Sequence, residues 1–317
     1  MNAFRRLTFA LLALALTFGL APASRAADAP PAVINLINLP ADNSAEVYYA
    51  QELGYFKDAG LDVRITPMTN SGAIIAAIAG GGGDIGNAVV GTVADARGKG
   101  IPILFLAPAG LYDAASPTAA LSVVKDSPIK TAADLTGKVV AVSGLGDLTY
   151  FATRAWIDKN GGNSANVKFV ELPFPAMAAA VLQHRVDAAY IIEPFFTAAS
   201  DDLRILARAA ESVAPRYQAT GWVASESWLA AHPDLAIRFA AAIRRTAIWA
   251  NAHQKESAAI LPKYLKIDPA IVARMHRVPY AVTLDPRLIQ PPIDTAAKYT
   301  GQAPVAASTL IWTPPGK

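Results

Sequence analysis

The feature that most constrains this fold is a regular alternation of short apolar runs with segments of helical spacing. Residues 32–39 (AVINLINL) and 61–68 (LDVRITPM) are apolar runs typical of buried strands. Residues 43–60 between them carry apolar side chains at helical spacing and end on a glycine, which predicts one helix. The pattern continues to residue 109 and begins again at residue 119. Strands that alternate with helices form mostly parallel sheets, so we expect an α/β protein.

The first 26 residues have the pattern of a secretory signal peptide. Two arginines precede an apolar run over residues 7–20, and small residues lead up to Ala26. The run is too short for a typical membrane span, although an N-terminal membrane helix is the alternative interpretation. We expect cleavage near Ala26 and a periplasmic protein.

The rest of the chain is electrically balanced and lacks cysteine. The full sequence has 28 Lys and Arg against 25 Asp and Glu, and three arginines fall in the first 26 residues. The remainder therefore gives no electrostatic reason to expect nucleic acid or an anionic membrane as a partner. Without cysteine it has no disulfide, no thiolate metal site and no lipid-modified cysteine, so we expect a released, soluble protein.

Gly81, Gly83 and Gly86 have the G-x-G-x-x-G spacing of a dinucleotide-binding turn. In that turn the glycines follow a strand and open a helix, so that the helix N-terminus faces the pyrophosphate. Here Gly81 and Gly83 follow the predicted helix 73–79 and precede the predicted strand 84–90, which contains Gly86. We therefore interpret them as a helix end and a tight turn, and expect no cofactor.

No other motif assembles a catalytic site. Residues 127–130 (SPIK) match S-x-x-K, but the partner motifs of that enzyme class are missing and Ser-Pro commonly opens a turn. The four histidines are isolated from one another in the sequence. We expect neither an enzyme nor a metal site.

Several short motifs resemble those of periplasmic substrate-binding proteins of the nitrate/sulfonate/taurine transporter class, which is also described as SsuA/THI5-like, NMT1-like or thiamine-pyrimidine-synthase-like. The resemblance extends from Ala32 to about Ala259. Its motifs are residues 54–57 (GYFK) with 60–63 (GLDV), 84–86 (DIG), 134–138 (DLTGK), and 187–188 (DA) before Glu193-Pro194.

This resemblance implies a periplasmic-binding-protein type II clamp, in which two lobes, each with a mostly parallel sheet flanked by helices, close on a ligand by hinge motion. The chain of that fold crosses between the lobes twice. The pattern places these crossings at 119–124 and 219–225. Lobe I would then be 27–118 plus 226–317, and lobe II would be 125–218.

Open parallel sheets bind ligands beyond the carboxyl ends of their strands. This rule selects the loops 38–44, 69–72, 87–91, 143–149, 171–175 and 193–196, and the resembling family uses the same loops. With one further aromatic residue, Tyr112, the candidate ligand-binding residues are Asn38, Asp42, Ser44, Ser71, Gly72, Asn87, Tyr112, Ser143, Gly144, Asp147, Thr149, Phe174, Glu193 and Phe195.

Most of these candidates also have a structural interpretation. Ser71 and Ser143 each precede a glycine at a helix start, where backbone N–H groups can hold a ligand acceptor, but either serine can simply cap its helix. Phe174 lies between two prolines in a predicted loop, which favours an apolar wall of the site. The corresponding structural roles are a helix cap for Asp147, a turn for Asn87, a solvated loop for Asp42, core packing for Phe195 and a strand end for Glu193.

The same loops contain acids but no Arg or Lys, and a bidentate Arg often binds sulfonates and dicarboxylates. We therefore expect a neutral or singly charged small organic solute, such as an aminopyrimidine or an aromatic acid, with a sulfonate-like compound as the choice that the family suggests. The resemblance implies a monomeric solute-binding protein that serves an inner-membrane ABC permease. The competing functions are an enzyme on this fold, pyrimidine-synthase-like or menaquinone-pathway-like, and a ligand-sensing domain of a signalling system.

Overall fold

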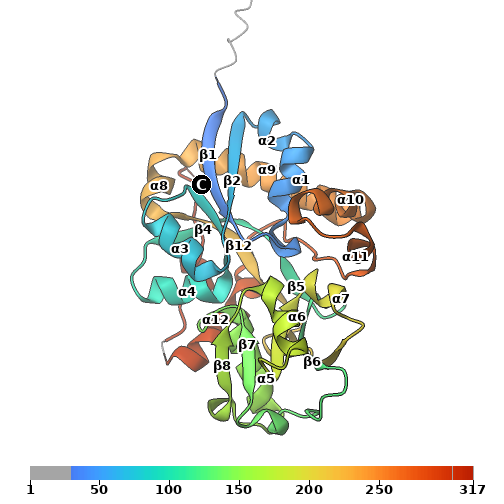
Figure 1. Ribbon diagram of the computed structural model, residues 1–317. Helices are drawn as coiled ribbons and strands as arrows, with labels where there is room; N and C mark the ends of the chain where they lie inside the picture. Colours follow the sequence, from blue (N-terminus) through green and yellow to red (C-terminus); the bar gives the residue numbers. More distant parts are fainter. Residues whose placement is uncertain (1–29, 302, 317) are drawn as a thin grey trace, which may run out of the picture. The chain divides into compact units, whose positions relative to one another are not determined.

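A computed structural model describes residues 30–301 and 303–316. The predicted signal peptide lies outside the described residues. By its contacts the chain divides into Met1–Pro30 and Pro31–Lys317, and the second unit contains every helix and strand described (Figure 1). No helix of the described residues is long and apolar enough to cross a membrane.

The first sheet of this unit has five strands. Their order is β2 (Leu61–Pro67), β1 (Ala32–Asn38), β3 (Ile85–Val89), β12 (Thr220–Ser225) and β4 (Ile103–Pro108). β1 is parallel to both β2 and β3, whereas β12 is antiparallel to both β3 and β4. Four strands therefore run in one direction, and only the strand from late in the chain opposes them.

The second sheet repeats this arrangement. Its order is β10 (Leu203–Ala207), β6 (Ala119–Val124), β9 (Ala188–Ile192), β7 (Val139–Val142) and β8 (Lys168–Glu171). β7 is parallel to β8 and β9, and β6 is antiparallel to both of its neighbours. The mostly parallel sheets predicted from the β-α alternation are confirmed.

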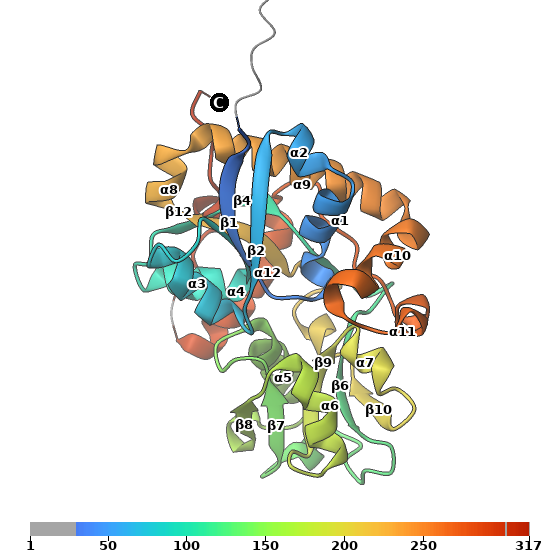
Figure 2. The ribbon, with the colours of Figure 1, turned by 45° about the horizontal axis from the view of Figure 1, so that its top comes forward.

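Two short strands stand between these sheets. β5 (Leu111–Asp113) follows β4, β11 (Arg216–Gln218) precedes β12, and the two pair with each other in an antiparallel ribbon. The chain leaves the first sheet through β5 and returns to it through β11. Both passages thus lie slightly earlier in the chain than the crossings predicted at 119–124 and 219–225. Those two apolar, buried runs form inner strands of the sheets. Figure 2 shows the two sheets as separate groups of strands, with β1 and β2 in one and β7 and β8 in the other.

Helices cover both faces of the first sheet. One face packs against α1 and α9, around Trp222 and Phe239, and the other packs against α3, α4 and α12, around Phe105. The helices that follow strands of the first sheet, or lie in the C-terminal part, are α1 (Glu46–Glu52), α2 (Tyr55–Asp58), α3 (Ser71–Ala79), α4 (Val90–Gly98), α8 (Glu226–Ala231), α9 (Pro233–Ala252), α10 (Gln254–Leu265), α11 (Pro269–Arg274) and α12 (Pro286–Thr300).

The second sheet has three helices of its own, α5 (Leu148–Lys159), α6 (Phe174–Leu182) and α7 (Phe195–Ala198). Its two faces bury separate apolar clusters. One contains Leu148 and Ala152 of α5, and the other contains Met177 and Val181 of α6. Each sheet therefore has its own core on both faces.

The single helix predicted over residues 43–60 is wrong. A 3-10 turn, Asp42–Ser44, precedes α1, and Gly54 separates α1 from α2. Gly54 has φ 74°, a left-handed conformation that glycine adopts without the steric cost of a Cβ atom. The glycine thus ends the first helix although the apolar spacing continues beyond it.

Gly81 and Gly83 lie between α3 and β3, as expected, and Gly86 lies within β3. Gly81 has φ 76° in the turn after the helix. A Cβ atom at Gly86 would lie 2.5 Å from Ile74 Cγ2 of α3, so this glycine permits the close approach of helix and strand. These positions serve the turn and the packing, and the strand–turn–helix order of a dinucleotide-binding turn is not formed there.

Candidate functional site

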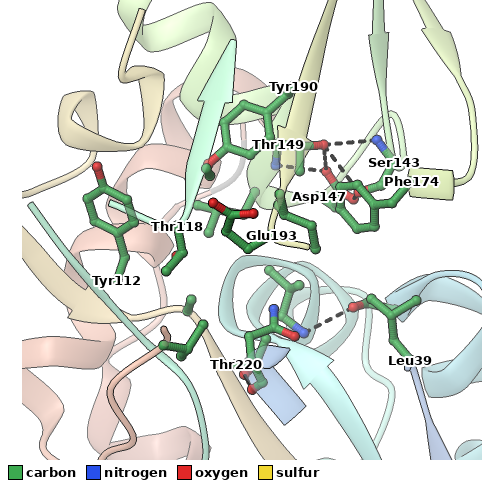
Figure 3. Close-up of a pocket in the computed structure, with 18 of the residues that line it drawn as sticks. Leu39, Tyr112, Thr118, Ser143, Asp147, Thr149, Phe174, Tyr190, Glu193 and Thr220 are labelled. Carbon is green, nitrogen blue, oxygen red and sulfur yellow. Dashed lines mark hydrogen bonds between the residues drawn. The ribbon is translucent and has the colours of Figure 1, made fainter. Parts of the chain in front are cut away.

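A pocket that is partly open to solvent lies between the two sheets, and its empty space is about 730 Å³ when the part open to solvent is included. Figure 3 shows residues of the second sheet's side, such as Tyr190 and Phe174, facing Leu39 and Thr220 of the first. The lining residues are Leu39, Asn43, Asn70, Ser71, Val89, Leu111, Tyr112, Thr118, Ala119, Ser143, Asp147, Leu148, Thr149, Phe174, Tyr190, Ile192, Glu193, Tyr217, Ala219, Thr220 and Val278.

Half of the residues predicted from sequence line this pocket. They are Ser71, Tyr112, Ser143, Asp147, Thr149, Phe174 and Glu193. Most follow the carboxyl ends of parallel strands or begin the next helix, which is where ligands bind in open α/β sheets. Phe174, expected in a loop, is the first residue of α6. The strand-end rule therefore brings together residues that are far apart in the sequence.

The other predicted residues do not line the pocket. Asn38 donates through Nδ2 to the Ser44 carbonyl oxygen at 3.4 Å, and Ser44 Oγ donates to the Leu39 carbonyl oxygen at 2.6 Å. Both side chains therefore hold the loop after β1. Phe195 lines a separate, open groove with Pro175 and Tyr264. Gly72 and Gly144 follow lining serines without lining the pocket themselves.

Asp42 is fully buried, and its interactions explain why it is not part of the lining. Its carboxylate accepts hydrogen bonds from Arg277 Nε and Nη2, each at 3.1 Å, and from the Val278 backbone N–H at 2.9 Å. Tyr49 and Tyr280 contact the same carboxylate. The solvated loop acid that we considered for Asp42 is thus wrong.

Asn87 is buried inside the first sheet and does not line the pocket. It pairs with Trp222 across β3 and β12, and only 2% of its surface is exposed. Asn87 Nδ2 has no hydrogen-bond partner among the described residues. The turn considered for Asn87 is also wrong, because the residue lies within β3.

Ser143, Asp147 and Thr149 form a closed network at the start of α5. Asp147 caps the helix by accepting the backbone N–H groups of Thr149 at 2.9 Å and of Tyr150 at 3.3 Å. It also accepts the hydroxyl groups of Ser143 and Thr149. Burial raises the pKa of Asp147, and these hydrogen bonds oppose that rise. Because both carboxylate oxygens are occupied, Asp147 orients the serine and threonine in the pocket wall.

Glu193 is the other acid of the pocket. It follows β9, and its carboxylate accepts the Thr197 backbone N–H at 3.1 Å and the Thr197 hydroxyl at 2.8 Å. Burial raises its pKa above the ordinary value for a glutamic acid. Glu193 is thus held at a fixed position at the end of the strand, where it lines the pocket (Figure 3).

Sequence reasoning missed several lining residues that come from inside strands. Tyr190 lies in β9 and Tyr217 lies in β11, and both line the pocket. Thr118 and Thr220, at the starts of the antiparallel strands, were missed for a related reason, since the rule that we applied searches the carboxyl ends of parallel strands. The aromatic pattern of the sequence offered a signal only for Tyr112.

The lining carries acids but no base. Asp147 and Glu193 are its only carboxylic acids, and Arg, Lys and His do not occur among its residues. Within the described ranges 30–301 and 303–316, no group of three or more His, Cys, Asp or Glu side chains could hold a metal ion. The pocket is therefore polar and partly aromatic, without a positive charge in its lining.

A family model described as NMT1/THI5 like matches residues 41–257, more than half of the chain. The chain belongs to the NMT1/THI5-like family. This match covers parts of both sheets and all the pocket residues except Leu39 and Val278. A search of curated proteins finds no match for this member of the family.

Solved structures match this NMT1/THI5-like chain over most of its length. The periplasmic aliphatic sulphonate binding protein SsuA from Escherichia coli has a TM-score of 0.72 at 17% identity, covering 90% of this chain and 93% of SsuA. A ligand-binding component of an ABC-type import system from Staphylococcus aureus has a TM-score of 0.77 at 15% identity, covering 89% and 96%. The desulfurization enzyme DSZB has a TM-score of 0.65 at 17% identity, covering 88% and 96%.

At these identities the likeness concerns the fold. The expected fold class, a periplasmic-binding-protein type II fold with two mostly parallel sheets flanked by helices, is confirmed. Because DSZB is an enzyme, the fold alone does not separate solute binding from catalysis. That distinction depends on the pocket.

Proposed function

We propose that this protein is an extracytoplasmic solute-binding protein that captures a small organic solute between its two sheets. The pocket carries this proposal, because side chains from both sheets and from the linking strands line one concave site that is aromatic in part and holds a few polar groups, as small-molecule sites commonly do. Its two acids are occupied by hydrogen bonds from Ser143, Thr149 and Thr197. This arrangement favours binding over acid–base chemistry.

The two sheets with their helices act as the lobes of a clamp in this proposal. The ribbon of β5 and β11 supplies the hinge, since both chain passages lie there. This assigns residues up to β4 and from β12 onward to lobe I, and residues from β6 to β10 to lobe II. Hinge closure around ligand is typical of such two-lobed binding proteins.

The solute that we propose is neutral or singly charged. A pocket with no Arg or Lys in its lining lacks the bidentate partner that commonly binds sulfonates and dicarboxylates. Tyr112, Phe174 and Tyr217 supply aromatic surface for a flat ring. An aminopyrimidine or an aromatic acid fits these walls, and a sulfonate-like compound is the alternative suggested by SsuA.

Delivery to an inner-membrane ABC permease completes the proposal. The structural likeness to a component of an ABC-type import system supports this partner, and the likeness to periplasmic SsuA supports a periplasmic location. We propose a monomer that needs no cofactor. A desulfurization-type enzyme is the second candidate, supported by the likeness to DSZB, and it predicts consumption of the bound compound.

Thermal unfolding of residues 27–317, which include the compact unit Pro31–Lys317, tests the proposal. The protein is refolded to remove carried-over ligand and mixed with alkyl sulfonates, nitrate, aromatic carboxylates or aminopyrimidines, each at about 1 mM. A solute bound with micromolar affinity adds about 4 kcal/mol to the free energy of unfolding at that concentration, a shift of several degrees. Mass spectrometry of the mixture then shows whether the compound is consumed.

A pocket-filling variant shows where the compound binds. Ala219→Phe places a ring in the pocket, and Ala241→Phe makes the same change on the exposed face of α9. The shift should disappear in the first variant and persist in the second. If Ala219→Phe does not unfold cooperatively, Thr118→Leu is the milder pocket variant. A shift that survives both pocket variants, or no shift with any compound, would contradict the proposal.

A further inference from the structure

Three tyrosines from different strands meet in the wall of the pocket. Tyr112 of β5, Tyr190 of β9 and Tyr217 of β11 all line it, and their exposed surface fractions are 3%, 3% and 1%. The rings of Tyr112 and Tyr217 are stacked with their centroids 5.2 Å apart. Figure 3 shows the Tyr112 and Tyr190 side chains on the same side of the pocket as Thr118. One wall is thus rich in phenol groups.

The Tyr112 hydroxyl is buried without a hydrogen-bond partner among the described residues. The side chains of Tyr190 and Tyr217 make no hydrogen bond to these residues either. Other buried tyrosines of the chain are paired, since Tyr49 Oη receives a hydrogen bond from Arg277 at 2.7 Å and Tyr280 Oη donates to the Asp42 carbonyl oxygen at 2.5 Å. An unpaired buried hydroxyl is costly, whereas one that meets a ligand acceptor gains a hydrogen bond. The contrast identifies the three pocket hydroxyls as the unusual ones.

All three phenols are donors at neutral pH. Burial raises the pKa of Tyr112 to about 12, and burial also raises the pKa values of Tyr190 and Tyr217 above the ordinary value for tyrosine. A protonated phenol donates one hydrogen bond, and up to three donors are therefore available to the same ligand.

The charges of the pocket indicate which acceptor these donors would meet. Asp147 and Glu193 are acidic, and the lining contains no basic side chain to balance an anion. A carboxylate or sulfonate would lose its hydration shell without a counter-charge in the lining, which is costly in a partly closed site. Arg208 acts on Tyr112 from outside the lining, but the charge of Glu211 opposes it. A neutral carbonyl oxygen avoids this cost, and a neighbouring N–H of the same ligand can donate to a carboxylate.

We propose that Tyr112, Tyr190 and Tyr217 form a donor subsite for an uncharged carbonyl or carboxamide group of a flat organic solute. This inference rests on the proposed solute-binding function and narrows its ligand class. Within that function, the subsite selects neutral amide-type solutes over carboxylates and sulfonates of the same shape.

A matched set of probes tests the selectivity. Benzamide, benzoate and benzenesulfonate share one ring and differ in the group attached to it. Their dissociation constants are measured by calorimetric titration of residues 27–317 at pH 7.5 and constant ionic strength. We expect benzamide to bind at least roughly tenfold more tightly than either anion, because only the anions meet two acids without a base.

Variants that remove single hydroxyls test the subsite. Tyr190→Phe and Tyr217→Phe should each weaken benzamide binding roughly threefold to tenfold, the value of one lost hydrogen bond. Neither change should lower the melting temperature of the ligand-free protein, because no hydrogen bond is lost. Tyr280→Phe is the matched control, because its buried hydroxyl is paired and lies outside the pocket lining. It should lower the melting temperature and leave the benzamide affinity unchanged.

The outcomes separate this inference from the function on which it rests. Tighter binding of benzoate or benzenesulfonate, or benzamide affinity that is unchanged in both pocket variants, would overturn the subsite and leave solute binding in place. Failure of benzamide to bind while another compound of the wider panel shifts the melting temperature would do the same. Only the failure of every compound would remove the proposed function as well.

Discussion

At the scale of single residues, two buried acids near the first sheet behave differently. Asp42 is paired with Arg277, whose side chain is only 11% exposed. Glu46 in the first turn of α1 is also fully buried, but it has no ion-pair partner among the described residues, and only the Trp222 side chain and the backbone of Glu46 itself oppose the effect of burial. Burial therefore raises the pKa of Glu46 well above its ordinary value, and the nearby charge of Asp42 adds to the rise.

The stability of the protein should consequently depend on pH through Glu46. The pKa of Glu46 is higher in the folded protein than in the unfolded chain. The stability that this difference contributes is fully present below the unfolded-state pKa, and it is lost as the pH rises through the folded-state pKa. Glu46→Gln mimics the protonated acid and does not titrate. Between the unfolded-state and folded-state pKa values, the free energy of unfolding of the variant should therefore rise relative to that of the wild type by about 1.4 kcal/mol for each pH unit. Urea unfolding of both proteins from pH 4 to pH 8 measures the difference.

Glu52 is the control for this measurement, because it is exposed and has the opposite shift. The hydrogen bonds that Lys263 and Tyr264 donate lower the pKa of Glu52. Its contribution is present above the unfolded pKa and is lost as pH falls, so Glu52→Gln should be less stable than the wild type near neutral pH and equal to it in acid. A stability difference for Glu46→Gln that does not change with pH would contradict the assignment.

The same residues show what the sequence could not predict. The role of Asp42 depends on Arg277, which lies 235 positions later, and no local pattern joins them. Tyr190 is hidden for a different reason, since it lies inside an apolar strand pattern that is typical of core. Ser143 and Asp147 were accessible to prediction, because a polar residue between a strand and a helix start can be placed from the local sequence.

At the scale of elements, residues in turns and at helix ends determine where a helix stops, even where the apolar periodicity of the sequence continues. The strands of both sheets were predicted from their apolar runs, and the glycines after α3 were correctly assigned to a turn. The division of residues 43–60 was not predicted, because Gly54 interrupts the helix without interrupting the apolar spacing. Backbone conformation at one glycine therefore changed an element that hydropathy alone defines as continuous.

Replacement of Gly54 should reveal this conformational role. No atom lies within 4 Å of a Cβ placed at Gly54, so the cost of Gly54→Ala comes from the left-handed backbone alone, about 1 kcal/mol of unfolding free energy. Gly146 has equally open surroundings but no left-handed φ, and Gly146→Ala should leave stability unchanged or slightly higher. Urea unfolding of the two variants checks this. Equal effects of the two substitutions would contradict the explanation.

At the scale of the whole described unit, the same strand order occurs in both sheets. In each, the single antiparallel strand is the one that follows a passage through the β5–β11 ribbon. The pocket lies between the sheets and takes lining residues from both and from the ribbon. This arrangement supports our central proposal, that the two sheets with their helices are lobes that close on a solute. The β-α alternation predicted the two sheets, but the contacts between them involve segments too distant in sequence for periodicity to place.

A measurement of the distance between the two lobes tests that proposal most directly. Because the chain has no cysteine, Ala79→Cys on α3 and Ala179→Cys on α6 place one spin label on the exposed surface beside each sheet. Pulsed electron paramagnetic resonance then gives the distance distribution with and without the compound that stabilises the protein most. Closure of the lobes predicts a shorter and narrower distance distribution with the compound. In the Ala219→Phe variant the compound should not change the distribution. An unchanged distribution in the presence of a saturating, stabilising compound would contradict it.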